Sequence, residues 1–179
     1  MRSGALVVLL VLAVGLAWSA EDFALIEQDP QAFRVKVGWA DLGDFDDGVT
    51  VAVEYGTPEF LATFGWADAG GLLTDSMGMG YSFDGDYWFG EATYTFRPPA
   101  NPLMYVGCGL GWYCVDGDFV ESGNPANRSS GDDSSIGGHV VVGVESENRR
   151  YFGEIRWIFG TEHWSWDSDG LRAYVGLRF

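Results

Sequence analysis

Alternation of apolar with other residues at every second position is the feature that most constrains this chain. It recurs in eight segments, 33–39, 49–55, 60–66, 88–96, 104–112, 140–144, 155–159 and 171–179. A two-residue period is that of a β-strand, whose side chains point alternately to its two faces. The 26 glycines also disfavour helices. We therefore expect an all-β protein.

The two faces of these segments differ from those of a soluble sheet. One face is apolar and carries large aromatics near its ends, including Trp39, Trp66, Trp88 and Trp112. The other mixes glycine with charges of both signs, and both features are typical of a barrel that is apolar outside and polar inside. The segments approach the roughly 9–11 residues that cross a bilayer. We predict an eight-stranded antiparallel transmembrane β-barrel with up-and-down topology over 33–179.

The first residues have the organisation of a secretory leader. Arg2 precedes an apolar run over 5–16, and Ala17-Trp18-Ser19 supplies small residues at a cleavage site. We expect a signal peptide over 1–19 and a short periplasmic N-terminal segment over 20–32. The apolar run is too short to cross a bilayer comfortably.

The connections between segments alternate in length. Those at 97–102 and 147–150 are short, those at 41–48 and 161–170 are intermediate, and 116–135 is long, polar and acidic. Bacterial barrels have short periplasmic turns and longer external loops. The pattern places the chain in a Gram-negative outer membrane with 116–135 as its main external loop.

The segment 72–83 also alternates, and 84–86 (Asp-Gly-Asp) has the composition of a hairpin turn. A ninth membrane strand is incompatible with both termini on one side. Either 72–83 belongs to a long external loop, as an extension hairpin above the membrane, or an earlier segment is not a membrane strand. We favour the first interpretation.

The inward face carries a set of charged residues of both signs. An eight-stranded barrel is just wide enough for its own side chains, and buried charges need partners. We therefore prefer an ion network that plugs the lumen to a polar conduit or a catalytic cluster, and expect charges on the adjacent strands of Glu154, Arg156 and Arg172 to meet. The predicted network is Arg34, Lys36, Glu54, Glu91, Glu145, Glu154, Arg156 and Arg172, with His139 on the same face.

The last nine residues, LRAYVGLRF, end on an aromatic residue in mid-alternation. They resemble the closing strand of bacterial outer-membrane barrels, and the stretches YVGCGLGWY and GGHVVVGVE resemble the small eight-stranded barrels of the OmpA/OmpX-like type. This resemblance implies that the last strand closes the barrel against the first. It also implies that Tyr174, Leu177 and Phe179 form a signal read by the outer-membrane assembly machinery.

Two further patterns suggest chemistry that we do not adopt. His163 and Ser165 resemble the His-x-Ser of lipid A deacylases, but Trp166 stands where that family has Asn, and no Glu follows Glu162. Acidic clusters at Asp44, Asp46 and Asp47 and at Asp132 and Asp133 suit Ca²⁺ by ligand type but match no binding motif. We expect no catalytic residue, metal or cofactor.

The net charge limits the binding partners of the chain, and the positions of its cysteines limit the disulfides that it can form. The net charge of −16 excludes nucleic acid. Cys108 and Cys114 lie six residues apart on one strand, too far for a disulfide, so both thiols should be free. We expect a monomer surrounded by outer-membrane lipid, with a structural or surface-interaction role and a possible extracellular ligand at its loops. A small pore and, less favoured, an outer-membrane lipid hydrolase are the alternatives.

Overall fold

The computed structural model describes residues 32–74, 78–122, 124 and 126–179. The expected signal peptide and nearly all of the segment 20–32 lie outside the described residues. Within these ranges, no helix is long and apolar enough to cross a membrane.

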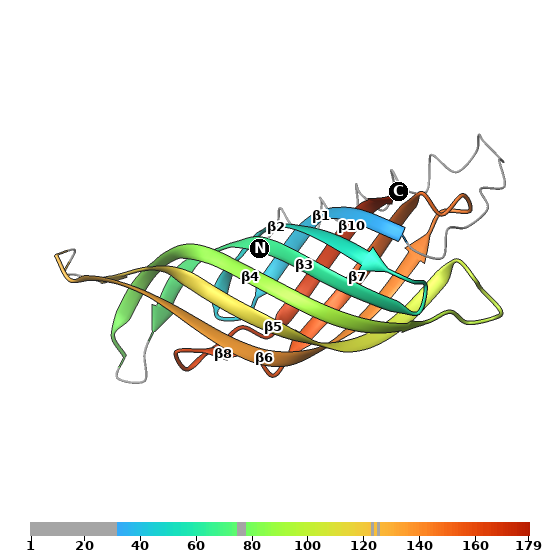
Figure 1. Cartoon of the computed structure of the whole chain (residues 1–179). Helices are drawn as coiled ribbons and strands as arrows, with labels where there is room; N and C mark the ends of the chain where they lie inside the picture. The colour runs from blue at the N-terminus through green and yellow to red at the C-terminus, as the bar shows by residue number, and fades with distance from the viewer. Residues whose placement is uncertain (1–31, 75–77, 123, 125) are drawn as a thin grey trace.

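Eight antiparallel strands form a closed barrel, as predicted (Figure 1). The order around the barrel is β1-β10-β7-β6-β5-β4-β3-β2, so each strand pairs with its sequence neighbours and the last pairs with the first. A two-stranded hairpin, β8 and β9, lies in the connection between β7 and β10. The strands are β1 (Ala32–Leu42), β2 (Phe45–Gly56), β3 (Phe60–Thr74), β4 (Gly80–Phe96), β5 (Met104–Glu121), β6 (Arg128–Glu145), β7 (Tyr151–Phe159), β8 (Glu162–His163), β9 (Trp166–Asp167) and β10 (Gly170–Arg178).

The seam between β1 and β10 confirms that the last strand closes the barrel. Their register runs from Arg34 opposite Arg178 to Ala40 opposite Arg172. The amide of Phe179 donates to the carbonyl of Phe33 at 2.8 Å, which continues the ladder to the last residue.

Alternation places large apolar side chains outside and polar ones inside. Phe64, Trp112 and Trp157 are about half exposed, whereas Arg34, Thr93 and His139 are almost completely buried. The glycines of β5 leave room for inward side chains of their own and adjacent strands: a β-carbon at Gly109 would collide with the His139 ring, and one at Gly111 with the Tyr113 hydroxyl.

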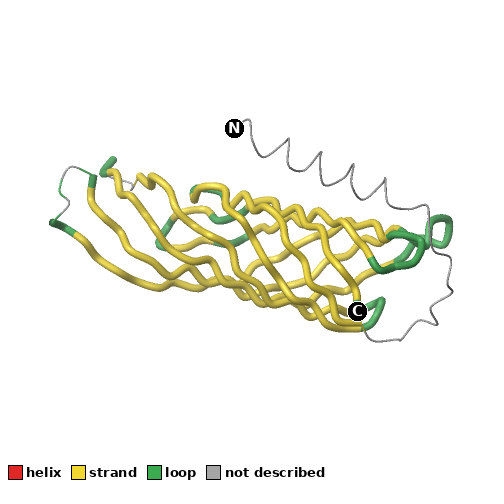
Figure 2. Tube along the Cα trace, turned by 90° about the horizontal axis from the view of Figure 1, so that it is seen from above, coloured by secondary structure: helices red, strands yellow, loops and turns green. Residues whose placement is uncertain are grey.

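Strands β3 to β6 are 15–18 residues long, against 9–12 for the other barrel strands. They continue past the last residues that pair with β2 and β7, at Ala67 and Gly138. We call this four-stranded extension, residues 68–74, 80–86, 115–121 and 128–137, the blade. Figures 1 and 2 show it projecting from the end of the barrel opposite the C-terminus.

The strands correct three loop predictions, two of them in the blade. Residues 84–86 are not a turn, because they lie within β4 and pair with 68–70 of β3. The expected loop 116–135 is mostly strand, since β5 and β6 pair as far as Val120 and Arg128. Most of 41–48 is also strand, with Gly43 at φ 69° in a tight turn.

These loop predictions treated polar composition as a sign of irregular structure. Backbone pairing begun in the barrel instead continues along the hairpins, whatever the outward side chains are. In segment 72–83, residues 72–74 of β3 pair with 80–82 of β4, which agrees with the extension hairpin favoured from the sequence; residues 75–77 lie outside the described residues.

Candidate functional site

The barrel interior gathers all eight residues of the expected charge network, each at most 5% exposed. In the first group of contacts, Arg34 of β1 pairs with Glu54 at 3.1 Å and with Glu145 at 2.9 Å. Lys36 contacts Glu54 at 2.9 Å and Glu154 at 2.6 Å. Each of these cations therefore joins carboxylates from two different strands.

A second group centres on Arg156 of β7. Its guanidinium contacts Glu154 at 3.0 Å and Glu54 at 3.4 Å, and forms a short ion pair with Glu91. Arg172 reaches the same Glu91 at 2.9 Å from β10, the strand diametrically opposite β4. The eight residues comprise four cations and four carboxylates, so the network is formally neutral.

The expected contact of Glu154 and Arg172 across neighbouring strands is wrong. Arg156 lies directly opposite Arg172, and Glu154 lies opposite Tyr174. Arg156 and Arg172, which face one another in the ladder, both form ion pairs with Glu91 of β4. Like charges in register are thus separated by a carboxylate from across the barrel.

Sequence reasoning missed several members of this interior. Arg97, in a turn, contacts Glu145 at 2.8 Å. The hydroxyls of Tyr105 and Tyr113 donate to Glu154 at 2.8 Å and Glu91 at 3.1 Å, and the Arg172 guanidinium lies 3.8 Å from the centre of the Phe89 ring. Tyr105, Tyr113 and Phe89 could have been found from the sequence, because they alternate in step with the inward-facing residues of their strands. Arg97 lies outside any strand, so alternation gives no signal for it.

The three residues of the expected assembly signal face in different directions. Leu177 and Phe179 are 39% and 70% exposed on the outer surface. Tyr174 points inward, where its hydroxyl lies 3.2 Å from that of Thr50 and its ring lies beside the Lys36 ammonium. In the folded barrel Tyr174 is therefore part of the interior.

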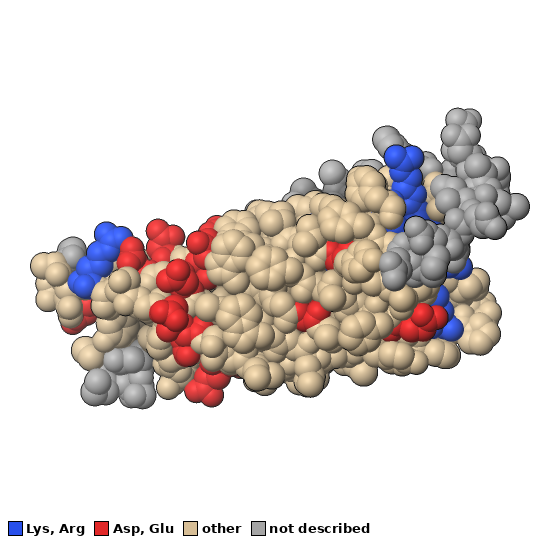
Figure 3. Space-filling view, in the orientation of Figure 1, with Lys and Arg blue, Asp and Glu red and all other residues tan. Residues whose placement is uncertain are grey.

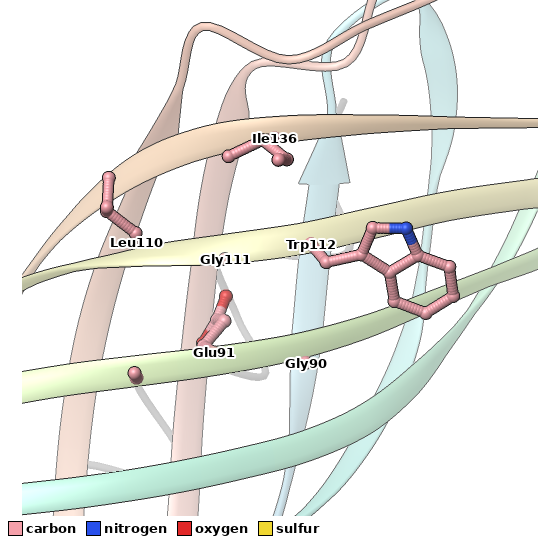
Figure 4. Close-up of a pocket in the computed structure, with 7 residues that line it drawn as sticks. Gly90, Glu91, Leu110, Gly111, Trp112 and Ile136 are labelled. Carbon is pink, nitrogen blue, oxygen red and sulfur yellow. The ribbon is translucent and has the colours of Figure 1, made fainter.

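A dent of about 360 Å³ marks the outer wall where Gly90 of β4 adjoins Gly111 of β5 (Figure 4). Leu110, Trp112 and Ile136 border it on the apolar surface. Glu91 lies behind the wall and is 5% exposed. The dent therefore presents an apolar surface.

His163 and Ser165 are not brought together. His163 is buried in the β8–β9 hairpin, and its Nε2 lies 3.5 Å from the Ser135 hydroxyl of β6. Ser165 is exposed and occupies the turn of the hairpin with Trp164, at φ 77° and 50°. Burial lowers the pKa of His163, and nearby Asp133 opposes this shift.

A groove of about 310 Å³ lies on the inward face of the blade, beside this hairpin. Its lining is Tyr81, Phe119, Ser129, Ser130, Gly131, Trp164 and Trp166. The rings of Phe119 and Trp166 stack at 5.7 Å, and Trp164 meets Phe119 edge-on at 4.9 Å. The Asp133 carboxylate accepts a hydrogen bond from the backbone amide of Trp164 at 2.7 Å. This bond holds the hairpin against β6.

The outer face of the blade is acidic. Asp68, Asp86, Asp116 and Asp132 lie opposite one another across four strands. Figure 3 shows carboxylates gathered around this end and basic side chains mainly at the other. Among the described residues, the blade and its neighbouring turns hold fifteen carboxylates, Asp41, Asp44, Asp46, Asp47, Asp68, Asp84, Asp86, Asp116, Asp118, Glu121, Asp132, Asp133, Glu162, Asp167 and Asp169.

Only one lysine or arginine, Arg128, lies in this described region, and it pairs with Asp118. The acidic clusters predicted from the sequence are thus part of a wider acidic surface. Across the described ranges, no three His, Cys, Asp or Glu side chains group so as to hold a metal ion. Cys108 and Cys114 are both free, as expected.

The fold is similar to solved structures of two small outer-membrane proteins. Ail, the attachment invasion locus protein of Yersinia pestis, solved with the heparin analogue sucrose octasulfate, matches at a TM-score of 0.54 and 13% identity. The match covers 84% of this chain and all of Ail. Neisserial surface protein A matches at a TM-score of 0.50 and 12% identity, over 84% of this chain and 96% of that one.

Neither a protein-family model nor a curated protein sequence matches the chain. The structural likeness shows that this chain has the fold of the small eight-stranded outer-membrane barrels of the OmpA/OmpX-like type.

Proposed function

We propose that this chain is a monomeric bacterial outer-membrane barrel that acts without catalysis, through surface interactions of its blade. Its apolar outer wall suits lipid, and exposed aromatics lie toward both ends of that wall, with Phe33, Tyr55 and Phe96 at one end and Trp88 and Trp112 toward the other. The expected signal peptide and the fold likeness support the same location. Leu177 and Phe179 are available on the outer surface for recognition by the assembly machinery.

The interior supports a structural rather than a conducting role for the barrel. Four cations and four carboxylates neutralise one another, and Arg172 packs between Glu91 and the Phe89 ring. A barrel of eight strands has little space beyond its side chains. We propose that the lumen is plugged, which leaves no route for a solute.

The observation that carries this proposal is the blade. Four strands continue where the sheet is no longer closed, and they hold a partly exposed aromatic groove. Exposed apolar clusters on a soluble surface commonly mark interaction sites. The sulfated ligand of Ail does not suit this surface, because carboxylates would repel a polyanion.

Site-directed labelling tests the location. In a variant without native cysteines, Ser130→Cys in the blade should react with a membrane-impermeant maleimide on intact cells. Asn148→Cys, in the turn at the opposite end, should react only after the outer membrane is permeabilised. Labelling of the two positions in the reverse order would refute the proposed orientation.

A lipid assay tests the absence of catalysis. The purified barrel should release no fatty acid from outer-membrane lipid. Release that disappears in His163→Ala would replace this proposal with the hydrolase.

A further inference from the structure

The groove of the blade offers aromatic ring faces that the protein does not cover completely. Phe119, Trp164 and Trp166 are each partly exposed, and the indole nitrogen of Trp166 donates to the carbonyl of Thr74 at 3.1 Å. The rings are thereby held in place before any ligand arrives. Faces of tryptophan and phenylalanine attract cations and aliphatic chains.

Charge around the groove is predominantly negative. Glu121 lies opposite the groove residue Tyr81 in the β4–β5 ladder, and Asp133 is on the inward face of β6 beside Gly131. The surrounding turns add further carboxylates, and Arg128 is occupied by Asp118. Fields of this kind raise the local concentration of cations and exclude anions.

The groove also runs along the edge of a sheet. Strand β6 pairs with β5 on one side as far as Arg128, but with β7 only from Gly138. Residues 128–137 therefore form an edge that β7 leaves unpaired. The β8–β9 hairpin lies beside Asp133 and Ser135 of this edge, and the small side chains of Ser129, Ser130 and Gly131 line the groove beside the rest of it. Extended peptides bind such edges by adding a strand, with side chains in adjacent pockets.

The hairpin that completes the groove is held in an unusual conformation. Trp164 and Ser165 have φ of 50° and 77°, a region that residues other than glycine rarely occupy. Backbone strain of this kind tends to persist at binding sites. Here it places the indole of Trp164 between Gly131 of β6 and the ring of Phe119.

We propose that this groove binds an extended cationic peptide segment, with alternate basic side chains over the aromatic rings and backbone along the β6 edge. The inference rests on the proposed surface-interaction role and names the chemistry of its partner. Acidic carboxylates, ring faces and an open strand edge together select a basic, extended chain.

Binding can be measured with the full chain in nanodiscs of zwitterionic lipid. The probe is a labelled peptide of about ten residues with alternating Arg and Leu, read by fluorescence anisotropy. Saturable binding is expected, weakening at least about tenfold as salt rises from about 50 to 500 mM. Heparin and an alternating Glu-Leu peptide should not compete.

Two matched pairs of variants locate the site. Trp166→Ala should weaken binding by about tenfold or more, as loss of an aromatic anchor commonly does. Trp112→Ala, on the outer face of the barrel wall, should leave it unchanged. Glu121→Gln beside the groove should weaken binding more than Asp68→Asn on the outer face, although both remove one negative charge. Circular dichroism verifies that each variant is folded.

Several outcomes would overturn the inference. Equal losses in Glu121→Gln and Asp68→Asn would indicate a diffuse charge effect rather than a groove. Spermine that displaces the peptide at a similar concentration would indicate a small polyamine site. Absence of peptide binding in a folded barrel refutes the cationic partner, whereas the labelling experiment tests the proposed location separately.

Discussion

Replacement of Arg156 by alanine tests the interior most severely. The side chain is fully buried and contacts three carboxylates, Glu54, Glu91 and Glu154. Among the eight residues of the network, its removal leaves three cations against four carboxylates, so the network gains one net negative charge. Each carboxylate keeps another cation, from Arg34, Lys36 or Arg172. Breaking a buried pair costs about 3–5 kcal/mol, a large part of the stability of a typical domain.

Urea unfolding in lipid vesicles, followed by tryptophan fluorescence, measures this loss. Arg128→Ala is the matched control, because the Arg128 side chain is 65% exposed and its ion-pair partner is Asp118; it should lose far less. A double variant, Arg156→Met with Glu154→Gln, restores neutrality while Lys36 keeps Glu54 and Arg172 keeps Glu91, and it should recover part of the stability. A loss below about 1 kcal/mol in Arg156→Ala would mean that water solvates the carboxylates and that the interior argument is wrong.

The β8–β9 hairpin supports two further predictions. Burial lowers the pKa of His163, so the unfolded chain takes up a proton that the folded one resists, and stability should fall as the pH drops below about 6.5. His163→Gln should lose this component, which urea unfolding at pH 7.5 and 5 would detect; an unchanged pH dependence would contradict the argument. Ser165→Gly removes left-handed strain at φ 77° and should stabilise the hairpin by about 1 kcal/mol. Hydrogen exchange at 161–169 should then slow, and faster exchange would refute the strain.

The sequence predicted which side chains face the interior because the alternation along a strand identifies its inward-facing residues without any information about the turns. Glu54, Glu154 and Arg156 could be placed inside from their neighbours alone. Their partners could not be predicted, since Arg34 and Glu145 are 111 residues apart and their contact depends on the register around the whole barrel.

Apart from the extension hairpin favoured at 72–83, the blade was missed because its outward residues are polar and were therefore assigned to solvated loops. Asp84, Asp86 and Asp116 suggested solvated loops, although Phe83 and Phe119 alternate with them on the inward face and their ring centres lie 4.9 Å apart. The partners of this inward face come from the distant hairpin of Trp164 and Trp166, which no local pattern reveals. The groove is therefore a product of tertiary structure.

Conductance in planar bilayers tests the central claim about the barrel, that its side chains fill the lumen and leave no path for a solute. The wild-type protein should show no steady single-channel current. Arg156→Ala, if it stays folded, should conduct at most in brief events, because Arg172, Arg34 and Lys36 still occupy the interior. A stable, large current through the wild-type barrel would show that the interior is an aqueous path, and the pore would replace the function proposed here.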